Sequence, residues 1–390
     1  MRTVQLADFI SLRRGASYKG ALVGEKGVPL LGLGTIAKHG GFKTSGVRRY
    51  DGDAPERMLV RSGDLYVSLK DMTQEAALLG AVARVPSNIA VGRLTQDTIA
   101  LDVDSDFGID RDYLYWMLRG PRFRAYCRNL GTGTTNLDLS QNDFLSFEAK
   151  LPSLGVQKAA ARVLGVLDGK ISANRDVMAT SDELVRALYG RLPLSTLTLE
   201  SVASNVRDSI GVEEIAANEA YVGLEHLGRR SLWLDVQGVG ADVSSSKSQF
   251  VAGDVLFGKL RPYFHKVVLA ASGGVCSTDI LVVRATKAQD VALVAAVASS
   301  DATVAAAVQA SNGTKMPRAK WADIATCSIP DPDSSEVQEF RAIATPLMER
   351  AVEAVEENRR LAATRDELLP LLMSGKITVK DAEKTVEEVV

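Results

Sequence analysis

The feature that most constrains this sequence is an internal duplication. Residues 63–69, which read Gly-Asp-Leu-Tyr-Val-Ser-Leu, return at residues 253–260 as Gly-Asp-Val-Leu-Phe-Gly-Lys-Leu. In each copy a strand-like run, a Gly- and Thr-containing loop and a Pro followed by a Gln come next in the same order. Corresponding positions stay roughly 180 to 190 residues apart. A repeat this long predicts two related domains, because solenoids and propellers have much shorter repeats.

The composition fits a cytoplasmic protein with more than one hydrophobic core. The chain has 390 residues, 46% of them hydrophobic, which suffices for two or three domains of ordinary size. No apolar run reaches membrane-spanning length and the N-terminus lacks a secretory pattern, so we expect no membrane contact. The three cysteines, Cys127, Cys276 and Cys327, are odd in number and far apart. We expect buried free thiols rather than disulfides or a zinc site.

Each copy has the pattern of a mixed α and β domain. The turn dipeptides Gly63-Asp64 and Gly253-Asp254 precede apolar residues, and this predicts a core strand after each turn. Asp110 or Asp112 is expected to cap a helix that breaks at Gly120-Pro121 and then resumes. Its counterpart in the second copy is the Ala-rich stretch from about residue 291 to 310. The predicted fold class is therefore α/β, in the sense of mixed α+β.

Two long amphipathic helices follow the two copies. Apolar and small residues recur in alternating steps of four and three, which is the pattern of a coiled-coil seam. The first seam contains Ala160, Leu164, Leu167, Ile171, Asn174, Met178, Ser181, Val185 and Leu188. The second contains Val337, Phe340, Ala344, Leu347, Ala351, Ala354, Asn358, Leu361, Leu368 and Leu372, with interruptions at Pro346 and Arg365. We expect the helices to pair, with register fixed by the two Asn residues and with Pro346 kinking the second helix or delaying its start.

The helix length indicates a spacer of a particular size. A helix of about 33 residues is about 50 Å long, while one turn of B-DNA is roughly 34 to 36 Å. Two such helices in antiparallel pairing would place the duplicated domains at opposite ends, related by a pseudo-twofold axis. This arrangement is typical of a reader of two half-sites, and since the domains differ in sequence the half-sites need not be palindromic.

Basic residues cluster at matched places in both copies, although the formal net charge is only −2. Clusters of Lys and Arg on one face are what a polyanion requires. An ordinary solvated surface, or for Arg261 and Lys259 an ion pair with a carboxylate such as Asp279, is the structural alternative. The Gly-rich loops 131–136 and 311–315 can bring amides close to phosphate, or can be plain turns. The predicted DNA-binding residues are Arg48, Arg49, Lys70, Thr134, Asn136, Arg229, Arg230, Lys259, Arg261 and Lys315.

Several runs together resemble the specificity subunit of a type I restriction-modification system. They are Tyr221-Val222-Gly223-Leu224-Glu225-His226-Leu227, the run from Gly253 to Tyr263, Cys276-Ser277-Thr278-Asp279 and the twice-used Pro, Gln and long-helix block. The resemblance covers nearly the whole chain and leaves the acidic tail after Lys376 unassigned. For that tail, a partner-docking helix and a frayed end are both open.

The resemblance implies a fold, a function and partners. In that family the variable domains are target recognition domains, and the repeated helices form a spacer that docks two modification (methyltransferase) subunits. It implies double-stranded DNA with a split target, adenine methylation by the modification subunits and cleavage by separate restriction subunits. It also implies the following division: residues 1–152 as the first target recognition domain, 153–192 as the first spacer helix, 193–332 as the second recognition domain, 333–375 as the second spacer helix and 376–390 as the tail.

The sequence lacks the motifs that the chemistry itself requires. Adenine methylation needs an Asn/Asp-Pro-Pro-aromatic loop for a flipped base, yet no two prolines are adjacent. Glu148-Ala149-Lys150, with Asp143 nearby, resembles only a fragment of a nuclease motif, and the three histidines lack metal-ligand spacing. We expect a non-catalytic subunit without catalytic residues, metal or cofactor. The alternatives are a DNA-modifying or DNA-cleaving enzyme and a coiled-coil interaction scaffold without DNA readout.

Overall fold

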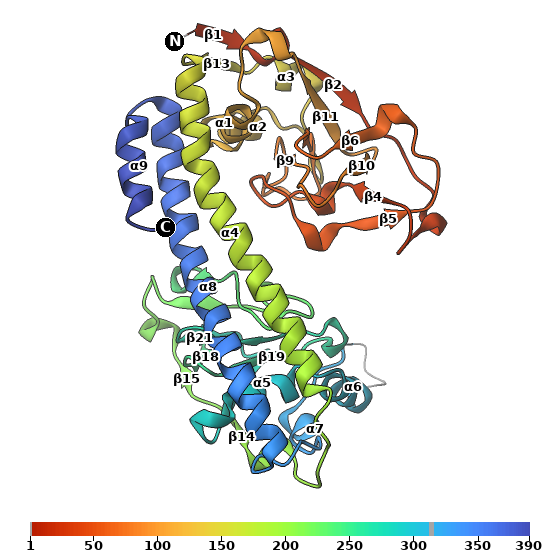
Figure 1. Cartoon of the computed structure of the whole chain (residues 1–390), viewed down its shortest axis with the longest axis vertical. Helices are drawn as coiled ribbons and strands as arrows, with labels where there is room; N and C mark the ends of the chain where they lie inside the picture. Colours follow the sequence, from red (N-terminus) through yellow and green to blue (C-terminus); the bar gives the residue numbers. More distant parts are fainter. Residues whose placement is uncertain (1, 312–315) are drawn as a thin grey trace. The chain divides into compact units, whose positions relative to one another are not determined.

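The computed structural model describes residues 2–311 and 316–390 and divides them into two compact units. The first unit consists of the residues up to Leu167 together with Ala363–Val390, and the second is Asp168–Ala362. The division falls within both long helices, α4 (Leu154–Tyr189) and α8 (Ser335–Ser374) (Figure 1). Each unit is therefore built on a segment of both helices.

Two sheets form the β part of the first unit. The four-stranded sheet has the order β2 (Ile10–Arg14), β11 (Ile99–Val103), β7 (Leu65–Val67) and β9 (Val82–Arg84). The five-stranded sheet has the order β3 (Val23–Gly24), β5 (Arg48–Tyr50), β4 (Val28–Leu31), β10 (Val91–Leu94) and β6 (Leu59–Arg61). Within the second sheet β4 and β10 are parallel, whereas the other pairs in both sheets are antiparallel. Two short pairs complete the unit: β1 (Arg2–Gln5) with β13 (Glu148–Leu151), and β8 (Lys70–Asp71) with β12 (Leu137–Asp138).

The second unit repeats this architecture. Its four-stranded sheet has the order β14 (Ala203–Val206), β22 (Ile280–Ala285), β19 (Val255–Gly258) and β20 (Val267–Leu269). Its five-stranded sheet has the order β15 (Ser209–Ile210), β18 (Lys247–Phe250), β21 (Gly274–Cys276), β16 (Ala220–Val222) and β17 (Gly238–Val239). The parallel pair is β16 with β21, in the same register as β4 with β10. The duplication expected from the sequence is therefore present in the strand topology, except that the fifth strand lies at opposite edges of the two five-stranded sheets, β3 beside β5 and β15 beside β18.

Equivalent positions also build the cores. In each unit one buried cluster takes residues from both sheets, and the strand registers match its members in pairs. These pairs are Leu31 and Val222, Val60 and Phe250, Tyr66 and Leu256, Ala83 and Val268, Leu94 and Cys276, and Ala100 and Val282. The pairs differ in side chain but all remain buried, because a core needs apolar volume more than particular residues.

The repeated Gly-Asp turn has the same conformation in both units. Gly63 and Gly253 both have φ of 86°, a left-handed value that glycine adopts without steric cost. Asp64 accepts a hydrogen bond from the Arg61 amide, and Asp254 accepts one from the Val251 amide, both at 2.8 Å. The strands that follow, β7 and β19, are fully buried, as predicted.

The helices between the last core strand and the long helix also match. In the first unit they are α1 (Arg111–Arg119), α2 (Pro121–Leu130) and α3 (Gln141–Leu145), and in the second α5 (Val291–Ala298), α6 (Asp301–Ala310) and α7 (Trp321–Ala325). Asp110 caps α1 by accepting a hydrogen bond from the Tyr113 amide, and the break at Gly120 lies where it was predicted.

Cys127 and Cys276 are buried free thiols. Burial raises the pKa of each to about 12, whereas Cys327 is half-buried.

The two long helices pair within the second unit, where their segments run in opposite directions (Figure 1). Asn174 Nδ2 donates to Asn358 Oδ1 at 3.1 Å and to Glu357 Oε2 at 2.8 Å, so the two predicted seam amides contact each other. Both Asn side chains are buried, and a buried amide pair favours one register over its alternatives. The predicted delay at Pro346 is wrong, since α8 already begins at Ser335 and continues through it.

The tail after α8 forms a short helix in the first unit, α9 (Val379–Glu387), which Thr378 caps. Ala382 and Val386 are buried, and Glu383 pairs with Arg162 of α4 at 3.0 Å. The tail is therefore packed on its own unit rather than frayed.

Across residues 2–311 and 316–390 no single helix is long and apolar enough to cross a membrane, although the bent pair Ala288–Ala298 and Asp301–Ala310 would pass such a test together.

Candidate nucleic-acid interface

A polar groove opens beside the N-terminal end of β11 in the first unit. We call it the first groove; it has a volume of about 200 Å³. Its polar lining comes from the end of β2, the start of β8, the turn before β11 and the segment that leads into α3. These residues are Arg14, Lys70, Gln96, Asp97, Asp138, Ser140 and Gln141.

The second unit has a groove of about 540 Å³ beside the N-terminal end of β22, which we call the second groove. Its lining comes from the residue after β14, the residue after β19, the turn before β22 and the segment that leads into α7. The charged and polar residues are Asn205, Arg207, Ser209, Ser248, Lys259, Thr278, Asp279, Arg318 and Lys320, and Trp321 adds an indole ring.

The strand registers show that the two grooves occupy the same place in the repeat. Ile99 pairs with Arg14 and Val67 in the first unit, and Leu281 pairs with Phe257 in the second, which aligns β11 with β22. Asp97 and Asp279 therefore hold the same position, two residues before that aligned pair. Lys70 pairs with Asp138 in the first unit and Leu260 with Arg318 in the second, so Asp138 and Arg318 are also equivalent.

Lys70 lies between two carboxylates in the first groove. Its Nζ is 3.7 Å from Asp97 Oδ1 and 3.8 Å from Asp138 Oδ1. Arg14 Nε donates to the Gln96 carbonyl oxygen at 3.0 Å. The predicted DNA-binding residue Lys70 is thus held in place by its neighbours, and its side chain remains 38% exposed toward solvent.

In the second groove the ion pair to the shared aspartate comes from a different segment, the one that leads into α7. Arg318 Nη1 is 3.4 Å from Asp279 Oδ1, and Lys259 Nζ donates to the Thr278 carbonyl oxygen at 2.6 Å. Burial lowers the pKa of Lys259, while the nearby Asp279 carboxylate partly opposes that shift. Asp279 therefore does form an ion pair. Its partner among the described residues is Arg318, at 3.4 Å.

The predicted arginines of the first unit lie next to the first groove. Arg48 lines a hollow of about 410 Å³ that shares Gln96 and Asp97 with the first groove. Arg49 Nη1 donates to the Gly27 carbonyl oxygen at 2.9 Å, and both side chains belong to exposed positions of β5. Arg48 and Lys70 thus line two hollows that share a wall.

The first Gly-rich loop is closed at its base beside Lys70. Thr132 and Asp138 exchange backbone hydrogen bonds at 2.9 and 2.8 Å, and Gly133 has φ of 126°. Thr134 and Asn136 are exposed at the tip of this loop. Lys315 in the second loop lies outside the described residues. Whether either loop contacts phosphate stays a prediction.

Lys259 and Arg261 belong to the connection between β19 and β20, and Arg229 and Arg230, from the segment between β16 and β17, contact the same connection. Arg229 lies over the Phe264 ring at 4.0 Å, and Arg230 pairs with Asp301 at 2.9 Å. Arg261 is exposed, has φ of 52° and donates its amide to the Pro317 carbonyl oxygen, which places it next to Arg318.

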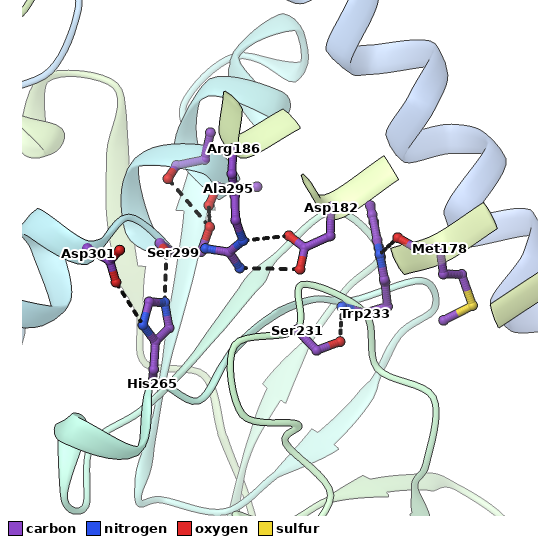
Figure 2. A network of polar contacts seen from close by, with 10 residues as sticks. Met178, Asp182, Arg186, Ser231, Trp233, His265, Ala295, Ser299 and Asp301 are labelled. Carbon is purple, nitrogen blue, oxygen red and sulfur yellow. Dashed lines mark hydrogen bonds and ion pairs between the residues drawn. The ribbon is translucent and has the colours of Figure 1, made fainter. Parts of the chain in front are cut away.

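A polar network links Asp301, the partner of Arg230, to the long helix α4; Figure 2 shows it from Asp301 to Asp182. Arg186 of α4 binds Asp182 through Nε at 2.8 Å and donates from Nη1 to the Ser299 carbonyl oxygen at 2.8 Å. His265 Nε2 lies 2.8 Å from the same oxygen, so Nε2 carries the proton. His265 Nδ1 is 3.5 Å from Asp301, the partner of Arg230. The network thus runs from the exposed Arg230 and Asp301 pair to helix α4.

Sequence reasoning missed several groove residues, among them Gln96, Asp97, Asp138 and Arg207. Asp97 and Asp279 both stand directly before the matched strand runs, so alignment of the two copies could have found them. Of the candidate nuclease residues, Glu148 and Lys150 are exposed on the same face of β13, and Asp143 accepts the Ser140 hydroxyl at the start of α3. Within the described part of the chain no three His, Cys, Asp or Glu residues form a group that could hold a metal ion.

Comparisons with known proteins identify similar chains. No family model matches the sequence. The type I restriction enzyme EcoDI specificity subunit of Escherichia coli is 22% identical over 223 residues, which cover 45% of this chain and 49% of that protein. The match thus spans about half the length of that relative.

Solved structures of two specificity subunits also match. The type I restriction-modification S subunit from M. genitalium has a TM-score of 0.56 and 14% identity, and the alignment covers 95% of each chain. The HsdS subunit from Thermoanaerobacter tengcongensis has a TM-score of 0.36 and 14% identity over 96% of this chain and 97% of that one. The resemblance to a type I specificity subunit expected from the sequence is confirmed, and the fold is that of the M. genitalium S subunit.

Proposed function

We propose that this chain is the non-catalytic DNA sequence-recognition subunit of a type I restriction-modification complex. The two units read the two halves of a bipartite target, and the paired helices set the gap and dock two modification subunits. Restriction subunits join the same complex. The recognition domains are residues 1–152 and 193–332, the spacer helices 153–192 and 333–375, and the tail 376–390.

One observation carries the proposal: two units of the same topology place a polar groove with cationic side chains at the same position. Two similar reading surfaces with unlike linings suit a target of two unlike halves. Arg and Lys on phosphates would position the duplex, while Arg, Lys, Asn or Gln on major-groove base edges would distinguish sequence. Of the predicted DNA-binding residues, Lys70 lines the first groove and Lys259 the second, and the buried pair of Asn174 with Asn358 gives the spacer a defined register.

Mapping of modified adenines tests the proposal. The full chain is co-expressed with modification subunits of a type I system encoded with it, and the methylated sites are sequenced. We expect a two-part motif with a constant gap. A catalytic enzyme would instead modify or cut DNA without the other subunits, and a scaffold without readout would leave the methylation pattern unchanged when both units are replaced.

The spacer has a separate test. Insertion of seven residues after Leu167 of α4 together with seven after Ala362 of α8 keeps the heptad seams and lengthens both helices by about 10.5 Å. That length corresponds to about three base pairs. We expect a gap longer by about three pairs with unchanged half-site letters. An unchanged gap would contradict the role of the helices as a spacer.

A further inference from the structure

The strand registers make the two grooves comparable residue by residue. Three equivalences matter: Asp97 with Asp279, Asp138 with Arg318, and Leu69 with Lys259. The aspartate before the aligned strand is the same in both units. The position on the segment that leads into α3 or α7 carries opposite charges, a carboxylate in the first unit and a guanidinium in the second.

Both residues at this position are held in place and yet accessible. The Asp138 side chain is 57% exposed and the Arg318 side chain 58% exposed. Asp138 is paired with Lys70, and Arg318 with Asp279. The backbone on which each residue sits is tied to the opposite strand, by the ladder of β8 with β12 in one unit and by the bridge of Leu260 with Arg318 in the other. An ion pair that leaves half of the side chain exposed orients its free edge toward a ligand in the groove.

The surroundings reinforce the difference between the grooves. Arg207 and Lys320 are exposed and line the same groove as Arg318. Lys259 also lines it and donates to the Thr278 carbonyl oxygen. In the first groove the matching positions of Arg207, Lys320 and Lys259 are occupied by Arg14, Ser140 and Leu69. The second groove therefore favours hydrogen-bond acceptors, whereas the first presents carboxylates that accept from donors.

We propose that Asp138 and Arg318 are the specificity-determining residues of the two half-sites. Arg318 donates to N7 and O6 of a guanine in the second half-site, which is the geometry an Arg fork matches best. Asp138 accepts from the exocyclic N4 amine of a cytosine in the first half-site. Each half-site thus contains a G·C pair, read from its purine by one unit and from its pyrimidine by the other. This inference rests on the proposed function.

The test uses the full chain co-expressed with the modification subunits and reads the methylated adenines by sequencing. Arg318→Gln should relax one G·C position of the second half-site, lowering discrimination there by roughly ten- to hundredfold. The first half-site and the gap should stay unchanged. Asp138→Asn should relax one position of the first half-site only. Arg318→Lys keeps the charge but not the forked guanidinium. It should lower the discrimination at the same position to a smaller extent.

Matched controls lie at the opposite ends of the same strands. Lys287 follows the far end of β22 and Asp106 lies beyond the far end of β11, and both are exposed. Lys287→Gln and Asp106→Asn should leave both half-sites intact. Assembly of each variant with the modification subunits, measured by size-exclusion chromatography, identifies any variant that fails to fold, and Arg318→Lys then decides the role of Arg318.

The outcomes separate the inference from the proposed function. A wild-type complex that methylates no bipartite motif would contradict the proposed function itself. A bipartite wild-type motif with no G·C pair in one half-site would overturn the inference alone. So would an Arg318→Gln complex whose motif is unchanged, or one that loses methylation uniformly at all sites, since uniform loss is the effect of a phosphate contact.

Discussion

In the first unit Arg93 is buried in β10 with its guanidinium 5.0 Å from the Tyr50 ring, whereas the second unit has Val275 at the same register position. The second unit instead buries Lys247 in the neighbouring strand β18, 5.7 Å from the Tyr221 ring. The grooves differ in the same way, because the cation paired with the shared aspartate is Lys70 in one unit and Arg318 in the other. The backbone topology is thus retained while the charged residues move to adjacent strands, which changes what each surface can bind.

The largest effect is expected from the conserved turn aspartates. Asp254 is buried and binds both Arg284 nitrogens at 2.7 Å, whereas Asp64 is partly exposed and its pair with Arg111 is 3.3 Å long. Asp254→Ala should lower the free energy of unfolding by about 3 kcal/mol, because it removes two charge-assisted hydrogen bonds from Arg284 and the bond from the Val251 amide. Asp64→Ala should cost about 1 kcal/mol. Hydrogen exchange, followed separately for each unit, measures both losses of stability. Equal losses would contradict the difference between the two turns.

A smaller effect is expected from the two buried cations. Arg93 donates to the carbonyl oxygens of Ser17 and Asp53 at 3.0 and 3.1 Å, joining two loops, while Lys247 donates to its close neighbours in the chain, Ser245 and Ser246. Arg93→Met should destabilise the first unit by about 2 kcal/mol, and Lys247→Met the second by about 1 kcal/mol. Denaturant unfolding measures both changes. A larger loss for Lys247→Met would show that local bonds matter more than loop-joining ones.

Salt dependence distinguishes the charge of the two grooves. Arg207→Gln combined with Lys320→Gln removes two exposed cations from the second groove, and Arg14→Gln removes one from the first. In the assembled complex the double change should reduce the slope of log affinity against log salt by about 2, and the single change by about 1. We expect roughly tenfold weaker binding for the double variant. Fluorescence titrations at several salt concentrations measure the slopes, and unchanged slopes would place these cations away from the duplex.

The smallest difference concerns acid stability. Burial, helped by Arg186 and Arg230 and opposed by Asp301, lowers the pKa of His265, which is 3% exposed. As the pH falls, the unfolded chain therefore protonates at His265 before the folded chain does. The stability that neutral His265 contributes is complete above about pH 6.5 and is lost as the pH falls toward the folded pKa. His265→Gln should flatten that loss in the second unit. Thermal unfolding at pH 7.5 and 5.5 measures it, and an equal acid response in variant and wild type would assign the loss to other groups.

The sequence predicts the parts of this structure that depend on local patterns. A period of seven residues is visible along one helix, so the seams and the meeting of Asn174 with Asn358 could be predicted. The Gly-Asp turns and their strands could also be predicted, because a turn dipeptide followed by apolar residues is a local pattern. The five-stranded sheets could not, because strands of two to four residues show no alternation. Nor could the partners of Asp97 and Asp279, since these depend on which distant strands lie side by side.

The division of the chain also bears on the order of events during synthesis. The second unit is a single stretch, Asp168–Ala362, whereas the first needs Ala363–Val390 to supply the end of α8 and α9. A ribosome adds about 5 to 20 residues per second, and domains generally fold as units when their chain has emerged. The N-terminal half therefore lacks the helix segments that complete its unit until residues 363–390 have been synthesised. A nascent chain stalled before residue 363 would leave this half exposed to chaperones and proteases.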